Sequence, residues 1–190
     1  APAEENQDTY NKIFGEDKVH NPEEFDKAVE ERLVDNYKQE SDYKFSKDIR
    51  DYLVKKADIK LPEEFLKRWL LHINEGKFTK EEIEKEAPAF FEDFRWQMVR
   101  NFLMQKFNLK VDEKEIHDAA QAYVAYQYAA YGMGNVPENL LKESAVRVLQ
   151  DENTLHRIIE NVEAQKVIES VKGAVSLDED KVSVEKFREL

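Results

Sequence analysis

The chain contains no cysteine, which excludes disulfide bonds and thiol catalysis from its chemistry. Five glycines and five prolines among 190 residues are too few for a β-sandwich or β-barrel, whose many tight turns need both. No stretch resembles a signal peptide or a membrane span. The sequence opens Ala1-Pro2-Ala3 without an initiator methionine, and we therefore expect it to belong to a longer protein.

Positive charge is also scarce, because 29 Lys and Arg face 41 Asp and Glu and leave a net charge of −12. Nucleic-acid phosphates are bound by clustered basic side chains, so nucleic acid is not an expected partner. The abundant Glu, Lys, Leu and Ala favour long helices. With 41% hydrophobic residues the chain can bury a real core, and we expect an all-α fold.

Catalytic and metal-binding signatures are missing from the sequence. No two histidines have metal-ligand spacing, and the two that follow a glutamate by four residues fit solvated helix surfaces. No serine sits in a nucleophile elbow, and no glycine-rich loop precedes a helix. We therefore predict no catalytic residue, no cofactor and no metal; the four histidines are His20, His72, His117 and His156.

Capping signals predict where the first helices begin. A turn of helix ending at Gly15 precedes Asn21-Pro22, where asparagine suits the N-cap and proline the first helical position. The helix that follows is expected to reach Lys56, with its narrow apolar stripe covered on one side only. The next helix is expected to run from Pro62 to Gly76.

The middle of the chain starts with Thr79-Lys80-Glu81-Glu82, the pattern of a capping box. Pro88 is expected to start or kink the next helix over residues 89–107. The link 108–112 then resembles the link 58–62 in its order of amide or acid, aliphatic, Lys and aliphatic residues. A last long amphipathic helix is expected to end at Gly173, with a short terminal helix after it.

The stretch Ala119–Pro137 contains no charged residue, although 37% of the chain is charged. Up to Tyr131 it predicts a helix with two apolar sides, and the turn after it predicts a helical hairpin. One side combines Ile116, Ala119, Ala120, Tyr123 and Ala130, and the other Val124, Tyr128 and Tyr131. Such a helix is either sandwiched between neighbours or exposes one side to a partner, and both readings stay open here.

Several short motifs follow one another in a fixed order: Pro2-Ala3-Glu4, Ile13-Phe14-Gly15, Ile59–Glu63, Leu109–Ile116, Glu163–Ile168 and Val182–Phe187. Their order and spacing resemble the C-terminal chaperone domain of bacterial trigger factor over nearly the whole chain. The hairpin turn Tyr131-Gly132-Met133-Gly134-Asn135-Val136-Pro137 is similar to that of Bacteroidota-type trigger factors.

This resemblance implies an elongated, all-α, multi-helix body with protruding helical-hairpin arms. It implies a cytoplasmic, ATP-independent chaperone that binds nascent or unfolded polypeptides, without cofactor, nucleic acid or membrane. Ribosome binding and the peptidyl-prolyl isomerase belong to family domains whose motifs this chain lacks. We expect a single domain over 1–190, with a leading segment 1–20, a long helix and first arm 21–107, a second hairpin 108–150, and a closing helix with tail 151–190.

Partly exposed apolar side chains on rigid helices are the expected client contacts. In the hairpin these are Tyr123, Val124, Tyr126, Tyr128, Tyr131 and Met133, and elsewhere Trp69, Phe90, Trp96 and Met104. The same side chains would also suit core packing. Two other functions stay open: a helical scaffold or dimerisation module that forms a homodimer through the hairpin, and the helical core of a periplasmic porin chaperone.

Overall fold

A computed structural model describes residues 6–16, 18–74, 76–134 and 136–189. These residues form eight helices and no strand, which confirms the all-α class. The motif Pro2-Ala3-Glu4, Asn135 of the predicted hairpin turn and Leu190 lie outside the described residues. The elongated shape and the division of a single domain at residues 20, 107 and 150 stay predictions.

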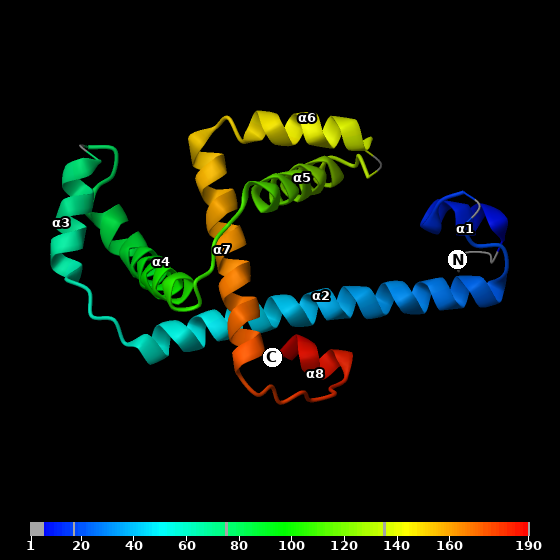
Figure 1. The fold of residues 1–190 in the computed structure, drawn as a ribbon, viewed down its shortest axis with the longest axis horizontal. Coiled ribbons are helices and arrows are strands. Elements are labelled where there is room, and N and C mark those ends of the chain that lie inside the picture. The colour runs from blue at the N-terminus through cyan, green and yellow to red at the C-terminus, as the bar shows by residue number, and fades with distance from the viewer. Residues whose placement is uncertain (1–5, 17, 75, 135, 190) are drawn as a thin grey trace. The chain divides into compact units, whose positions relative to one another are not determined.

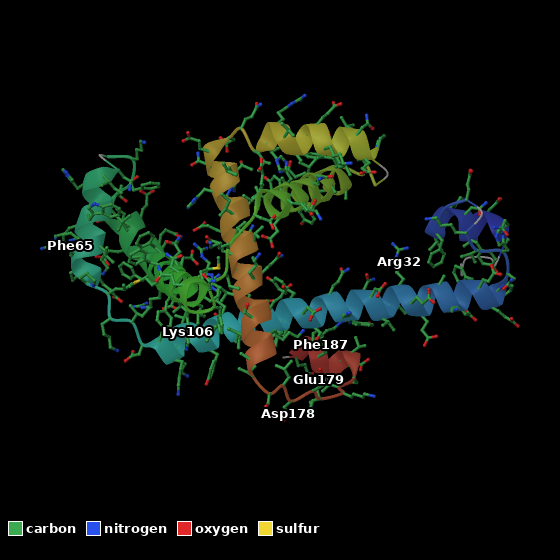
Figure 2. All side chains as sticks on the ribbon, viewed as in Figure 1. Arg32, Phe65, Lys106, Asp178, Glu179 and Phe187 are labelled. Carbon is green, nitrogen blue, oxygen red and sulfur yellow. The ribbon has the colours of Figure 1, made fainter. Side chains whose placement is uncertain are left out.

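Residues 1–49 and 50–190 form two compact units. In the first, α1 (Gln7–Phe14) packs on the opening turns of α2 (Pro22–Ala57), which continues into the second. Phe25 stacks on Tyr10 with ring centroids 4.8 Å apart and meets Phe14 edge-on. Arg32, labelled in Figure 2, donates to the Ile13 carbonyl at 3.2 Å and lies over the Phe14 ring.

The second unit contains two helix pairs joined through one long helix (Figure 1). The helix α3 packs on α4, α5 packs on α6, and α7 contacts both α4 and α5. The bounds are α3 Glu63–Ile73, α4 Lys80–Lys106, α5 Glu113–Ala130, α6 Glu138–Val148, α7 Glu152–Ala174 and α8 Val184–Glu189. The helical hairpin predicted for the uncharged stretch is therefore confirmed as α5 and α6.

Small side chains let α5, α6 and α7 approach closely. Ala120, Ala145 and Ile158, one from each helix, form a buried cluster. Ile116, Ala119 and Tyr123 pack against it, so the first predicted side of α5 is the core side over this stretch. Alanine at the contact brings two backbones together without leaving a void, and burial of this apolar surface holds the hairpin on α7.

The helix α4 corrects one prediction. It begins at Lys80, directly after Thr79, and includes Pro88, so the helix does not start at residue 89. Proline has no N–H, so the Glu84 carbonyl loses its intrahelical donor. The capping box at the start of α4 offsets part of this cost, because Thr79 Oγ1 accepts from the Glu82 N–H at 3.2 Å and Glu82 accepts from the Thr79 N–H at 2.7 Å.

The two similar links share a backbone conformation at their first residue. Asp58 after α2 and Asn108 after α4 have φ values of 45° and 52°, in the left-handed region. Asp and Asn tolerate this region better than other non-glycine residues, which explains the acid-or-amide position of the repeated pattern. The second link ends in a capping box, where Asp112 Oδ1 accepts from the Glu115 N–H at 2.9 Å.

A buried cation joins α4 to α7. Arg100 is 6% exposed; its Nη2 donates to Glu160 Oε1 at 2.9 Å, and its Nε lies 3.2 Å from Glu163 Oε2. The two carboxylates are one turn apart on α7, so a single guanidinium holds both. Among the described helices, none combines the length and hydropathy that a bilayer crossing requires.

Candidate functional site

A groove of about 240 Å³ lies between α5 and α6. The α5 side and the turn after it supply Val124, Gln127, Tyr128, Tyr131 and Met133, and α6 supplies Ser144, Arg147 and Val148. The turn is closed by two backbone hydrogen bonds, from Gly132 N–H to the Ala129 carbonyl and from Met133 N–H to the Tyr128 carbonyl, both 2.9 Å long. These bonds bring Tyr131 and Met133 to the mouth of the groove.

The tyrosines of the hairpin differ in their surroundings. Tyr126 and Tyr131 are 76% and 81% exposed. Tyr128 is half-buried, and its hydroxyl lies 3.2 Å from Ser144 Oγ across the groove. Tyr123 is half-buried against the alanine cluster. The second predicted side of α5 therefore faces α6 near its middle and solvent at its end.

Val124 requires a correction, because it is only 3% exposed. Its position on the second side of α5 suggested an exposed contact, but α6 covers this part of the helix and leaves Val124 as the floor of the groove. Met133 is half exposed, as expected for a contact residue.

A second apolar pocket, of about 210 Å³, lies between α3 and α4. Its walls combine apolar and acidic side chains: Leu70, Asn74, Phe78, Glu82, Ile83, Glu86, Ala87 and Phe90. The predicted contact Phe90 is half-buried here and stacks on Phe94 with ring centroids 6.1 Å apart. Phe78 is exposed at the rim, and the sequence reasoning did not select it.

The outward side of α3 carries an apolar stripe. Phe65, Trp69 and Ile73 follow one another at four-residue spacing and are 55%, 44% and 50% exposed; Figure 2 labels Phe65 on this helix. Trp69 is a predicted contact, whereas Phe65 and Ile73 are not among the predicted contacts. The missed signal is the width of the apolar arc, because Leu66 and Leu70 already suffice to pack on α4.

Trp96 also requires a correction, because it is only 6% exposed. Arg50 from the end of α2 lies over its ring, 5.6 Å from the centroid, and pairs with Asp93 at 2.5 Å. Met104 is half-buried on α4. The large hydrophobic side chains of α4 that face solvent are Met98 and Phe102.

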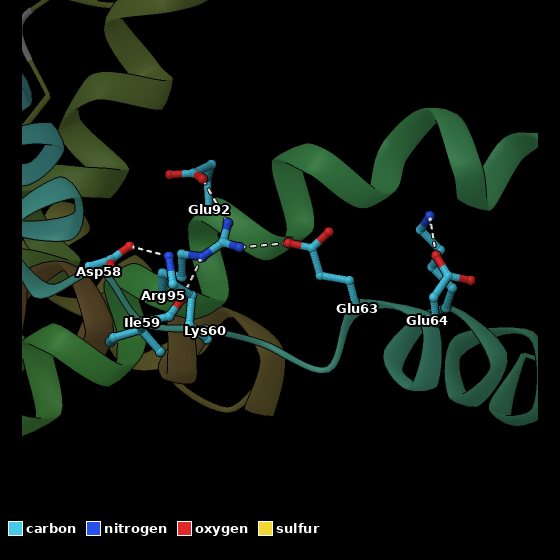
Figure 3. Close-up of polar contacts among 8 residues, drawn as sticks. Asp58, Ile59, Lys60, Glu63, Glu64, Glu92 and Arg95 are labelled. Atoms are coloured by element: carbon cyan, nitrogen blue, oxygen red, sulfur yellow. Dashed lines mark hydrogen bonds and ion pairs between the residues drawn. The ribbon is translucent and has the colours of Figure 1, made fainter.

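Arg95 of α4 bonds to the link that precedes α3 (Figure 3). Its Nε donates to the Ile59 carbonyl at 3.2 Å, Nη2 pairs with Glu63 at 2.7 Å, and Nη1 pairs with Glu92 at 2.8 Å. The three bonds join one guanidinium to the link, to the first turn of α3 and to α4. The stripe on α3 is thus held in a fixed direction.

Lys67 adds a second tie between α3 and α4. Its ammonium pairs with Glu84 at 2.8 Å and with Glu64 at 3.1 Å. The hydrogen bond to Glu84 and then that to Glu64 raise the pKa of Lys67. The cation therefore stays charged, and the tie holds, throughout the neutral range.

Glu115 ties the second hairpin to α7. It completes the capping box of α5 and pairs with Lys166 of α7. The hydrogen bond from Lys166, followed by that from the Asp112 N–H, lowers the pKa of the Glu115 carboxyl. One carboxylate thus closes the first turn of α5 and fixes α5 to its neighbour.

The described residues combine exposed apolar side chains with helices that are held by caps and ion pairs. No three His, Cys, Asp or Glu side chains among them come together in a way that could hold a metal ion. Their distinctive property is exposed aromatic surface on helices that are fixed by caps and ion pairs. Such surfaces bind apolar groups without demanding defined hydrogen-bond partners.

Comparison with known families gives one match. The family model described as "Probable trigger factor, C-terminal domain" matches residues 41–190, which is most of the chain. No curated protein and no solved structure matched the sequence.

Proposed function

Since the chain belongs to the trigger factor C-terminal domain family, we propose that it is an ATP-independent chaperone domain for unfolded or nascent polypeptides. The observation that carries the proposal is the row Phe65, Trp69 and Ile73, which leaves aromatic and aliphatic surface open to solvent on a fixed helix. Tyr126, Tyr131 and Met133 offer a second such surface on the other hairpin. Clients contact both surfaces through their own apolar side chains.

The free energy of client binding comes from covering this apolar area. Burial contributes about 25 cal/mol per Å², and part of it is offset by ordering the client. Each side chain therefore contributes little, and many of them together give weak, reversible and sequence-tolerant binding. Met133 adapts in shape to different client groups, which suits a site that must accept many sequences.

The rigid frame and the net negative charge keep the domain itself soluble. Phe65, Trp69 and Ile73 lie along one face of one helix, whose backbone keeps them near the surface. The net charge of −12 makes copies of the chain repel each other. The exposed aromatics therefore stay free for clients.

The other parts of the proposal follow from the family. The domain works in the cytoplasm, without nucleotide, cofactor, nucleic acid or membrane. Contact with the ribosome and prolyl isomerisation reside in trigger factor domains outside these residues, so this domain does not act as an enzyme.

The test is suppression of aggregation of an unfolded model protein. The double substitution Trp69→Ser with Tyr131→Ser removes one exposed aromatic from each hairpin, and we expect several-fold weaker suppression at unchanged helicity. The matched control is Tyr43→Ser with Tyr52→Ser, which removes two equally exposed aromatics from α2 and should leave suppression unchanged. Equal suppression by wild type and the hairpin variant would refute the proposal.

The exposed stripe also fits the alternative of a scaffold that self-associates. Sedimentation velocity over a range of concentrations separates the two functions. A tight dimer that Trp69→Ser dissociates, with no suppression of aggregation, would favour the scaffold. A porin chaperone would differ in acting on outer-membrane clients, and binding assays with unfolded porins and with unfolded soluble proteins separate the two.

A further inference from the structure

The α3/α4 pocket and the α5/α6 groove differ in charge. The α3/α4 pocket has two carboxylates in its wall, Glu82 and Glu86. In the α5/α6 groove, Arg147 is the one residue among the described lining residues that carries a formal charge at neutral pH. A cation beside an apolar groove is unexpected in a chain of net charge −12.

We propose that the α5/α6 groove binds client segments in which an apolar side chain has an Asp or Glu next to it. The apolar group lies on Val124 and against Tyr131, and the neighbouring carboxylate pairs with the Arg147 guanidinium. The inference rests on the proposed chaperone function and adds a sequence preference to one of its surfaces.

The surroundings of Arg147 favour an external anion. Its side chain is exposed, and no described salt bridge involves it, although Glu143 lies one turn earlier on α6. The nearby Lys142 is already paired with Glu138 at 2.5 Å. Arginine presents a planar set of donors that matches a carboxylate in two parallel hydrogen bonds.

The α5 side of the groove adds no competing charge. Residues 119–137 are uncharged, so no carboxylate from this stretch repels an acidic client. Charges farther than about 8 Å away are largely screened at physiological salt, which reduces the influence of the chain's net charge. The polar lining groups Gln127, Tyr128 and Ser144 are neutral and can bond to client backbone.

The α3/α4 pocket provides an internal comparison. The backbone and side-chain hydrogen bonds from Thr79 lower the pKa of Glu82, so the carboxylate at that pocket stays charged. An acidic client segment is therefore repelled at the α3/α4 pocket and attracted at the α5/α6 groove. The two surfaces together extend the range of clients that one domain accepts.

The experiment uses three unstructured peptides with the same apolar centre, flanked by Glu, Gln or Lys. Each has a photo-reactive group at the central position, so that mass spectrometry maps the cross-link to a helix. We expect the Glu peptide to label α5 and α6 roughly two- to fivefold more than the Gln peptide at low salt, the range for an exposed ion pair. High salt should reduce this preference.

Three variants isolate Arg147. Arg147→Gln should abolish the preference for Glu over Gln, and Arg147→Lys should keep most of it. Lys142→Gln, which removes the same charge from the same helix outside the groove, should leave the preference intact. Circular dichroism checks that every variant keeps its helicity.

Three results would overturn the inference. Equal labelling of α5 and α6 by all three peptides, with aggregation still suppressed, would remove the charge preference and leave the chaperone function standing. A preference that survives Arg147→Gln would assign it to another group. Absence of binding by every peptide, together with absence of suppression, would refute the chaperone function and this inference with it.

Discussion

No described side chain of α3 is fully buried, whereas the α5/α6 hairpin closes on Ala120 and Ala145, which are 0% and 1% exposed. Between α3 and α4, ion pairs of Arg95 and Lys67 lie at partly exposed positions beside half-buried apolar side chains. The α5/α6 hairpin is held by a dry contact between small side chains. Exposed ion pairs contribute little each, so α3 should open locally at lower free energy than α5 and α6.

The comparison explains where the apolar surface lies. A helix that buries little leaves most of its apolar arc uncovered, as the row Phe65, Trp69 and Ile73 does. A helix that closes on alanines hides its apolar side and exposes side chains mainly at its end, as Tyr131 does. The helix with less buried surface therefore has the larger exposed apolar surface, at the expense of local stability.

The largest effect is expected from enlarging the alanine contact. Ala120→Leu inserts three carbons where α5, α6 and α7 meet, and such overpacking should lower the free energy of unfolding by about 1–3 kcal/mol. Urea unfolding followed by circular dichroism measures it. Ala130→Leu, at an exposed position near the end of the same helix, is the control and should change stability little. Equal effects at both positions would contradict the close packing described for Ala120.

A smaller and more local effect is expected at Arg95. Arg95→Gln removes two ion pairs and the bond to the Ile59 carbonyl, with an expected loss of about 1 kcal/mol because these partners are partly exposed. Hydrogen exchange should quicken in α3 and in the link 58–62, and stay unchanged in α5 and α6. Lys60→Gln, whose pair with Asp58 stays within the link, is the matched control. Faster exchange in both hairpins would show that they open as one unit.

The smallest effect concerns pH. The pKa of the Glu115 carboxyl is lowered in the folded state, so its contribution to stability is present above the unfolded pKa and is lost as pH falls through the folded one. The free energy of unfolding should therefore fall below about pH 4.5. Glu115→Gln should make the profile flatter there, as measured by urea titrations at several pH values. An unchanged acid profile would mean that Lys166 and the cap do not stabilise the ionised form.

Much of the fold could be predicted from local chemistry. The capping pairs at Thr79 and Asp112 and the turn glycine Gly132 act within a few residues, so the sequence alone locates those helix ends. The predicted start of a helix at residue 89 was wrong, because the capping box at Thr79 already begins α4 at Lys80 and the helix includes Pro88. A sequence pattern predicts helix ends from nearby residues, whereas here contacts with α3 also stabilise α4 across Pro88.

The binding surfaces were predicted less completely, because exposure depends on which neighbour covers a side chain. Trp96 is covered by Arg50, which is 46 positions earlier, and Val124 by α6. Phe65 and Ile73 share the helix of Trp69, and no local signal says that α4 leaves them uncovered. Tyr126, Tyr131 and Met133 lie beyond the alanine contact, and their exposure agrees with the sequence reasoning.

The left-handed backbone at Asp58 and Asn108 affects how stiff the two links are. Glycine in their place would relieve the crowding of Cβ, yet it would let the backbone at each link sample many more directions. With Asp and Asn there, the left-handed conformation costs a little conformational free energy, and each link has fewer backbone conformations available than it would with glycine. Both helix pairs then hold their exposed aromatic side chains in constant directions, which is what the proposed binding of unfolded clients requires.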